Sequence, residues 1–203
     1  MQNQQARRYI MSNRIITISR EFGSGGRTIG KMAAKRLGIR CYDNELIQKI
    51  AQESGFVEEY IREEGEHAPQ GNWLASSFIG WNWNGPTNQD RLWTIQRNII
   101  LDLAESESCV IVGRCADFIL RDKNCLTVFI HSSMEKRALR IVNEYGERSE
   151  SPEQRLKNKD KRRAAYYRFY TDMKWGKAQN YHIALDSGEL GLEKCTDIIC
   201  SLY

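Results

Sequence analysis

A β-branched run that ends in a glycine-rich turn constrains the fold of this chain more than any other feature. The run covers Ile15–Ser19, and three glycines follow before Arg27. Helical spacing of the apolar residues begins at Thr28. A strand, a glycine loop and a helix N-terminus in this order direct backbone N–H groups and the positive end of a helix dipole at an anion. The chain is therefore predicted to bind phosphate esters, with nucleotides as the first candidates.

The glycine loop departs from the usual P-loop pattern, G-x-x-x-x-G-K-[ST]. If Gly26-Arg27-Thr28 fills the last three places, Arg27 replaces the lysine and Glu21 replaces the first glycine. If the frame moves back by one residue, Gly25 is the loop glycine and Gly26 stands in the lysine position. Neither frame places a lysine in the loop, so the phosphate cations are predicted to be arginines.

Two arginines flank the loop and are the candidate phosphate cations, Arg20 before the glycines and Arg27 after them. Arginine can bind a phosphate through two parallel hydrogen bonds, whereas lysine acts as a point charge. An ordinary βα turn is the alternative, but glycine density, flanking arginines and strand–helix context coincide here. The predicted donor-phosphate site consists of Arg20, Gly23, Ser24, Gly25, Gly26, Arg27 and Thr28.

The composition fits a single domain that binds an anionic small molecule. The chain has 203 residues, and its net charge of +4 is too modest to indicate a nucleic-acid surface. Its six cysteines include no C-x-x-C pair, which argues against a zinc site and fits free thiols in a reducing cytosol. No apolar run is long enough to span a membrane. We therefore expect a cytoplasmic protein that has no metal-ligand cluster and binds neither nucleic acid nor membrane.

Strands and helices are predicted to alternate along the chain. The expected strands are Arg14–Ser19, Ile39–Tyr42, Cys109–Val112, Leu126–His131 and His182–Leu185. The expected helices are Arg27–Leu37, Asn44–Ser54, Val57–Glu66, Asn88–Glu105, a helix to about Tyr145 that a Ser132-x-x-Glu135 capping box opens, Pro152–Tyr170 and Leu192–Leu202. This alternation predicts an α/β fold whose parallel sheet is covered by helices on both faces.

Four motifs lie on these elements, most of them where strands end. They are Ser19–Arg27 with Leu37-Gly38 and Tyr42-Asp43, then Val110–Asp117, then Phe129–Ser133 with Glu135–Ala138, and finally Asp160–Tyr167 with Trp175-Gly176. Together they resemble the cytidylate kinase-like family of P-loop nucleoside monophosphate kinases from about Ile15 to the C-terminus. The tryptophan-rich middle of the chain matches this family poorly.

The resemblance implies a three-layer P-loop kinase fold over residues 1–203. It also implies an acceptor-binding helical region at about 44–107 and a helical lid at about 148–178. The implied reaction is transfer of a phosphoryl group from ATP, with Mg²⁺, to a small acceptor. A pyrimidine nucleoside monophosphate, CMP or dCMP, is the first candidate for that acceptor.

Three residues are predicted to hold the acceptor through the same resemblance: Asp43, Arg97 and Arg114. Asp43 could also organise a metal, or it could cap the helix that follows it. A solvated helix face is the alternative for Arg97, and a surface ion pair is the alternative for Arg114. Cytidylate kinases carry aspartates on both sides of the Gly-Arg pair. Here Val112 and Cys115 fill those places, so selectivity for cytosine stays open.

A cluster of cations at the predicted lid supplies the remaining catalytic candidates. Arg162 and Arg163 are the leading ones, because phosphoryl transfer needs positioned cations and exclusion of water rather than covalent help. Asp43 is the third residue to which the resemblance gives a catalytic role. A solvated, charged helix face is the alternative for the two arginines.

The tryptophans of the middle segment leave several interpretations open. Trp73, Trp81 and Trp83 could stack a base, form a hydrophobic plug or contact a second copy in a homodimer. A nucleotide-binding regulatory module without turnover and a kinase for a non-nucleotide small molecule are the alternative functions. A nucleic-acid-binding protein is a third, and its affinity would fall steeply with salt.

Overall fold

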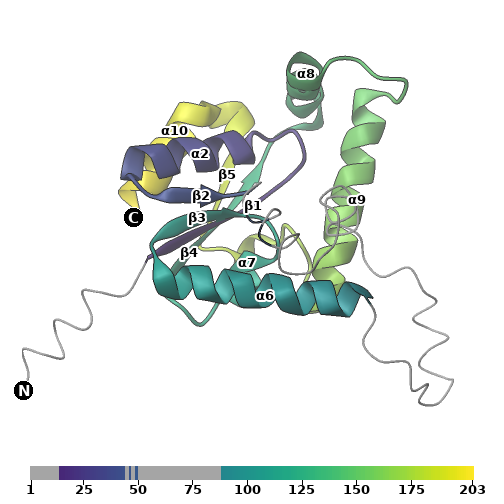
Figure 1. The fold of residues 1–203 in the computed structure, drawn as a ribbon. Coiled ribbons are helices and arrows are strands. Elements are labelled where there is room, and N and C mark those ends of the chain that lie inside the picture. The colour runs from purple at the N-terminus through teal and green to yellow at the C-terminus, as the bar shows by residue number, and fades with distance from the viewer. Residues whose placement is uncertain (1–13, 44–45, 47–48, 50–87) are drawn as a thin grey trace, which may run out of the picture.

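The computed structural model describes residues 14–43, 46, 49 and 88–203. In this part of the chain, parallel strands form one sheet in the order β2-β3-β1-β4-β5 (Figure 1). Their bounds are Ile15–Arg20 for β1, Arg40–Tyr42 for β2, Cys109–Val112 for β3, Cys125–His131 for β4 and Ile183–Asp186 for β5. All five strands were predicted to within one residue at each end.

The β-branched run that begins at Ile15 forms the central strand of the sheet, β1. Its first five residues are buried, as expected for a parallel strand with a helical layer on each face. Side chains alternate between the faces, so Ile16 and Ile18 lie in one core cluster and Ile15 lies in the other. Each fully buried isoleucine stabilises the fold by about 1.5–3 kcal/mol.

Helices cover both faces of the sheet and complete a three-layer α/β fold, which confirms the predicted fold class (Figure 1). On one face lie α2 (Gly26–Leu37) and α10 (Ser187–Ser201), and on the other lie α6 (Asn88–Ser106) and the short α7 (Ala116–Ile119). Two further helices, α8 (Met134–Tyr145) and α9 (Pro152–Thr171), pack against each other, with α8 beginning just after β4 ends. A 3₁₀ turn, η1, covers Ala178–Asn180 before β5. The ends of β1 and β4 thus lie close to α8 and α9.

The capping box predicted at Ser132 is wrong by one residue. Ser133 is the N-cap of α8, and its hydroxyl accepts a hydrogen bond from the backbone N–H of Lys136. Ser132 is buried, and its backbone N–H donates to the Glu21 carboxylate at 3.2 Å. Two adjacent serines offer the same local chemistry, and the contact with the glycine loop decides between them.

The last helix begins earlier than the prediction of Leu192. Asp186 caps it by accepting hydrogen bonds from the N–H groups of Gly188 and Glu189, and helical geometry resumes after a break at Gly191, where φ is 77°. Helix α7 and η1 were not predicted at all. The helices expected at Asn44–Ser54 and Val57–Glu66, and the tryptophan-rich loop, fall almost wholly outside the described residues.

Candidate active site

The loop between β1 and α2 holds two glycines in the left-handed backbone region. Gly23 and Gly25 both have a φ of 77°, which residues with a β-carbon rarely adopt. Space is short as well. A β-carbon at Gly25 would lie 2.6 Å from Leu192 Cδ2, and one at Gly23 would lie 2.8 Å from Ile141 Cγ2. The shape of the turn therefore requires both of these predicted loop glycines.

The N-terminus of α2 is open to an anion. Its N-cap, Gly25, has no side chain, and the first turn, which the structure describes in full, contains no acidic residue. The first four N–H groups of a helix have no partner inside the helix and carry partial positive charge. Together with the preceding glycine loop, this end of α2 is suited to a phosphate group.

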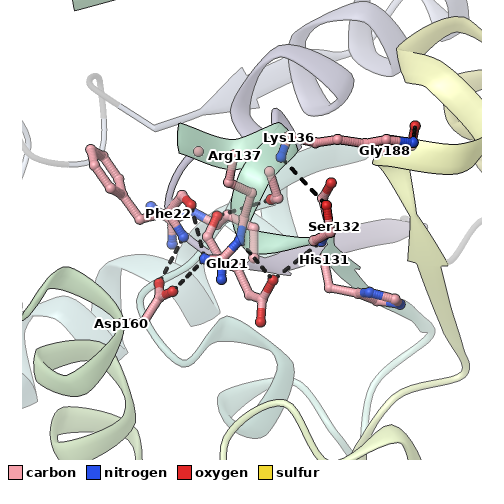
Figure 2. Close-up of polar contacts among 12 residues, drawn as sticks. Glu21, Phe22, His131, Ser132, Lys136, Arg137, Asp160 and Gly188 are labelled. Atoms are coloured by element: carbon pink, nitrogen blue, oxygen red, sulfur yellow. Dashed lines mark hydrogen bonds and ion pairs between the residues drawn. The ribbon is translucent and has the colours of Figure 1, made fainter. Parts of the chain in front are cut away.

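A buried arginine of α8 contacts the glycine loop and holds it in place (Figure 2). Arg137 is 6% exposed, and its Nη1 donates to Asp160 Oδ2 at 2.5 Å and to the backbone oxygen of Phe22 at 3.2 Å. Its Nε lies 3.4 Å from Glu21 Oε2. Asp160, from α9, also accepts a hydrogen bond from the Phe22 N–H at 2.7 Å. One cation thus joins the loop, α8 and α9.

The charged neighbours of Arg137 are only partly hydrated. Burial raises the pKa of Glu21, and the adjacent Arg137 guanidinium and the Ser132 N–H oppose that rise. The Glu21 carboxylate therefore depends on Arg137 for its charge.

Ser24 stabilises the conformation of the loop through its hydrogen bonds. It is fully buried, and its hydroxyl donates to the backbone oxygen of Glu21 at 2.9 Å. Its own backbone oxygen accepts a hydrogen bond of 2.5 Å from the hydroxyl of Ser187, at the start of α10. The Ser24 backbone N–H also donates to the backbone oxygen of Glu21, at 3.3 Å, so the polar groups of Ser24 hold the turn together and its predicted contact with the donor phosphates stays a prediction.

A cleft of about 460 Å³ runs along the loop and the start of α2. It brings together most of the residues that the sequence singled out. Its walls are the predicted donor-site residues Arg20, Gly23, Gly25, Gly26, Arg27 and Thr28, the predicted Asp43, Arg114 and Arg163, and also Glu21, Phe22, Glu144, Tyr145 and Lys159. The cleft is therefore the candidate site for a phosphate-bearing ligand.

Asp43 and Arg27 form an ion pair inside this cleft. The Asp43 carboxylate contacts Nε of Arg27, and the Asp43 side chain is 14% exposed. The pair places Asp43 next to the start of α2, and its predicted role with the acceptor or a metal stays a prediction. It also means that one of the two candidate phosphate cations shares its charge with a carboxylate of the protein.

A second, smaller cavity of about 40 Å³ adjoins the cleft. Arg20, Arg114 and Arg163 line both spaces. The other walls of the cavity are Ser19, Gly113, Cys115, Tyr166, Tyr167 and Trp175, so its described lining holds three guanidinium groups and no carboxylate. Arg163 is held there by a 3.2 Å hydrogen bond from Nη1 to the backbone oxygen of Arg20. This arrangement is suited to a small anionic group.

The backbone at the end of β3 is strained. Gly113, Arg114 and Cys115 follow one another with φ values of 79°, 60° and 52°. Two of them carry a β-carbon, and each such residue costs on the order of 1 kcal/mol or more in this region. The buried amide of Gln96 steadies the turn by donating to the Arg114 backbone oxygen at 3.1 Å. The strain directs Arg114 into the cleft, which is why we regard this turn as functional.

Asp117 lies buried on α7 below the small cavity. It accepts hydrogen bonds from the hydroxyls of Ser19, at 3.2 Å, and Tyr167, at 2.7 Å. Burial raises the pKa of this carboxyl, and the two hydroxyls oppose the rise. The network joins β1, α7 and α9. It therefore fixes the relative positions of β1, which carries Arg20, and α9, which carries Arg163.

Replacing Asp117 with asparagine is expected to change how stability depends on pH. The raised folded-state pKa means that ionising Asp117 costs more in the folded protein than in the unfolded chain, so its stabilising effect fades as pH rises above about 4. Asparagine keeps an acceptor but cannot ionise. The free energy of unfolding of D117N relative to the parent should therefore increase between about pH 4 and pH 7 in urea titrations. A constant difference across this range would contradict the raised pKa.

Two predicted residues lie away from the small cavity. Arg97 is exposed on α6 and lines neither of the two spaces around Arg20. Arg162 is also exposed and lines a different hollow of about 610 Å³, which adjoins the cleft at Phe22 and Tyr145. Its next neighbour, Arg163, lines the cleft and the small cavity instead. Both distant arginines stay predictions, since their roles require the chain to close around a ligand.

Sequence reasoning missed the residues that support the site. The motifs contain these residues but predict no individual role for them: Arg137, Asp160, Asp117 and Tyr167. The signal available for them was local: a polar residue within an apolar helix stripe, such as Arg137 between Met134 and Ile141. Their partners lie far along the chain, so the pairing itself had no local signal.

The chain belongs to the cytidylate kinase-like family, whose model matches residues 15–189. The similar solved structures include an uncharacterised protein from Eubacterium ventriosum, with 28% identity and a TM-score of 0.71 over 94% of this chain and 98% of that one. No curated protein sequence matches the chain. The expected resemblance is therefore confirmed.

Two more distant structures support the P-loop kinase fold alone. Shikimate kinase from Bacteroides thetaiotaomicron is 18% identical, with a TM-score of 0.56 over 93% of this chain and 97% of that one. A gluconokinase from Sinorhizobium meliloti is 16% identical, with a TM-score of 0.53 over 94% and 93%. The family and the fold are thus both kinase-like, and together they support a small-molecule kinase. Within the described residues, no helix is long and apolar enough to cross a bilayer.

Proposed function

We propose that this protein transfers the γ-phosphoryl group of ATP to a pyrimidine nucleoside monophosphate such as CMP or dCMP. The observation that carries the proposal is that Arg20, Arg114 and Arg163 line both the cleft and the small cavity. A donor phosphate on the glycine loop and an anionic acceptor group in the cavity would meet at these three guanidinium groups. The family of the chain supports the same reaction.

The chemistry requires little covalent help from the protein. An acceptor oxygen forms a bond to the γ-phosphorus while the bond from that phosphorus to the β–γ bridging oxygen breaks, and ADP leaves with the electron pair. A phosphate monoester is already largely ionised near neutral pH, so its oxygen can attack without a general base. Three arginines favour such an anionic acceptor over a neutral alcohol. Their main effect is to position the two anions and offset their mutual repulsion.

Each predicted site residue has a role in this scheme. The N–H groups of the glycine loop and the start of α2 bind the donor phosphates, with Arg20 and Arg27 as cations. Arg114 binds the acceptor, Arg97 approaches it from α6, and Arg163 stabilises the transferring group. Arg162 joins Arg163 when the predicted lid, about 148–178, closes over the cleft and excludes water.

The residues present also fit Mg²⁺ bound with ATP. This ion keeps several waters and uses few protein ligands besides phosphate oxygens. Thr28 offers a hydroxyl and Asp43 a carboxylate, and both line the cleft beside the loop. When bound, the ion would neutralise charge on the donor phosphates. The remaining acceptor contacts are proposed to come from the region at about 44–107, and the protein is proposed to act in the cytoplasm.

Two other functions stay open as alternatives. Val112 and Cys115 flank Gly113-Arg114 where cytidylate kinases carry aspartates, which favours either a different, non-nucleotide acceptor or a regulatory module that binds ATP without turnover. An assay of labelled ATP with a panel of nucleoside monophosphates, sugars and carboxylates distinguishes all three. Transfer to CMP or dCMP above all others is the expected result. Transfer to another acceptor or to none would replace the proposal by the matching alternative.

ATP with Mg²⁺ is expected to raise the melting temperature of the protein. A ligand at a hundredfold excess over its Kd stabilises the folded state by about 2.7 kcal/mol, roughly 5–10 °C for a domain of this size. Differential scanning fluorimetry measures the shift. Arg27→Ala should reduce it, because the variant removes one cation and leaves Asp43 without its partner. An equal shift in parent and variant would show that Arg27 does not contribute to phosphate binding.

A further inference from the structure

Gly26 occupies the position that the lysine has in the usual P-loop pattern. Helix α2 starts at Gly26, directly after the left-handed Gly25. In the pattern G-x-x-x-x-G-K-[ST], Gly25 is then the loop glycine, Gly26 takes the lysine position and Arg20 takes the position of the first glycine. The chain has therefore lost the lysine at one end of the pattern and gained an arginine at the other.

The side chain of Arg20 fills the space in front of Gly26. A β-carbon at position 26 would lie 2.6 Å from Arg20 Cβ and 3.1 Å from Arg20 Cγ. These atoms are close to the backbone of β1 and cannot move aside as a side-chain tip could. A lysine at position 26 and an arginine at position 20 thus exclude each other.

The guanidinium end of Arg20 lies against a second glycine, Gly113, at the end of β3. A β-carbon at Gly113 would overlap Nη1 of Arg20. Two glycines from different elements therefore leave room for one arginine, its stem at Gly26 and its head at Gly113. The head lines both the cleft along the glycine loop and the small cavity.

We propose that Arg20 takes over the role of the missing P-loop lysine and binds the donor phosphates at the point where they meet the acceptor. Arg27 does not take this role, because it stands one residue beyond the lysine position and its side chain lies at Asp43 rather than between the two glycines. The inference deepens the proposed function and rests on it for the identity of the phosphates as those of ATP. It assigns the positive charge that binds the donor phosphates to a residue of β1, whereas the P-loop lysine would lie on α2.

A charge swap tests this assignment. Arg20→Gly should weaken ATP binding by about tenfold to a hundredfold in isothermal titration, the range for losing a charged hydrogen bond. Gly26→Lys alone should be just as weak, because its β-carbon collides with Arg20. The double variant R20G/G26K removes the collision and restores the ordinary pattern, so it should recover at least tenfold over R20G. Alanine at position 20 would not serve, since its β-carbon would still collide.

A second pair of variants decides the matter if the double variant does not fold, as judged by its unliganded melting curve. Arg20→Met and Arg27→Met remove one charge each and keep most of the side-chain volume. The proposal expects R20M to lose at least tenfold more affinity for ATP than R27M. An equal or larger loss in R27M, or a folded R20G/G26K no better than R20G, would overturn it.

The readouts also separate this inference from the proposed function. Tight ATP binding without transfer to any acceptor would refute the kinase reaction, while the swap would still decide the role of Arg20. Transfer in the parent with unchanged ATP affinity in R20M would refute the role of Arg20 alone. A parent that does not bind ATP would overturn both.

Discussion

Replacing Arg163 with alanine is expected to slow phosphoryl transfer by about a hundredfold or more, while the affinity for either substrate changes far less. The guanidinium of Arg163 lines both the cleft and the small cavity, and a hydrogen bond to Arg20 holds it there. A cation at that place stabilises charge that spreads over the transferred phosphoryl group only in the transition state. A hundredfold loss corresponds to about 2.7 kcal/mol, within the range for such groups.

Single-turnover rates and equilibrium binding of ATP and CMP would separate the two effects. Lys161→Ala is the matched control, because it removes an exposed cation from the same helix and this residue lines none of the three described cavities. Arg162→Ala should reduce turnover less than Arg163→Ala, since Arg162 reaches the cleft only on lid closure. Turnover of Arg163→Ala within a few-fold of the parent would remove Arg163 from the reaction.

The sequence predicted those parts of the fold that depend on local chemistry. The β-branched run of β1 and the glycine at the end of α2 each carry a local signal. Gly38, with a φ of 68°, ends that helix as expected. The boundary errors arose where tertiary contacts chose between equal local options, as at Ser132 and Ser133. Helix α7 has four residues and little periodicity of its own, so only its packing beneath the sheet reveals it.

The candidate site was predictable to the extent that it lies on one continuous motif. The glycines and arginines from Arg20 to Thr28 are adjacent in sequence, and their chemistry points to phosphate without any tertiary information. The pairing of Arg27 with Asp43 and the fit of Arg20 between Gly26 and Gly113 depend on how strands lie side by side. The prediction therefore identified both cations and could not say where the side chain of each one lies.

Loss of Arg137 is expected to be the most destabilising single change at the site. The variant Arg137→Met keeps most of the side-chain volume but leaves the carboxylates of Glu21 and Asp160 without their shared cation. Breaking a buried charge pair in this way costs about 3–5 kcal/mol, and the lower end suits carboxylates that keep some contact with water. Urea-induced unfolding at pH 7 measures the loss.

The dependence on pH shows whether electrostatics causes that loss. Without Arg137, the Glu21 carboxyl should have a still higher pKa in the folded protein than in the unfolded chain, because burial raises that pKa and Arg137 opposes the rise. Such groups destabilise the fold when ionised and cease to do so as pH falls through their raised pKa values. The difference between R137M and the parent should therefore shrink as pH falls from about 7 to 4.

Arg36→Met provides the control for this experiment. Arg36 also pairs with two carboxylates, Glu193 and Asp197, but on the exposed surface of α2 and α10. Exposed ion pairs contribute little because water and salt screen them, so this variant should barely change the free energy of unfolding. If R137M were as stable as R36M, or if its deficit were the same at pH 4 and pH 7, the glycine loop would not depend on the charge of Arg137. Its position would then follow from packing alone, through the glycine turns and the contacts of Ser24 with α10.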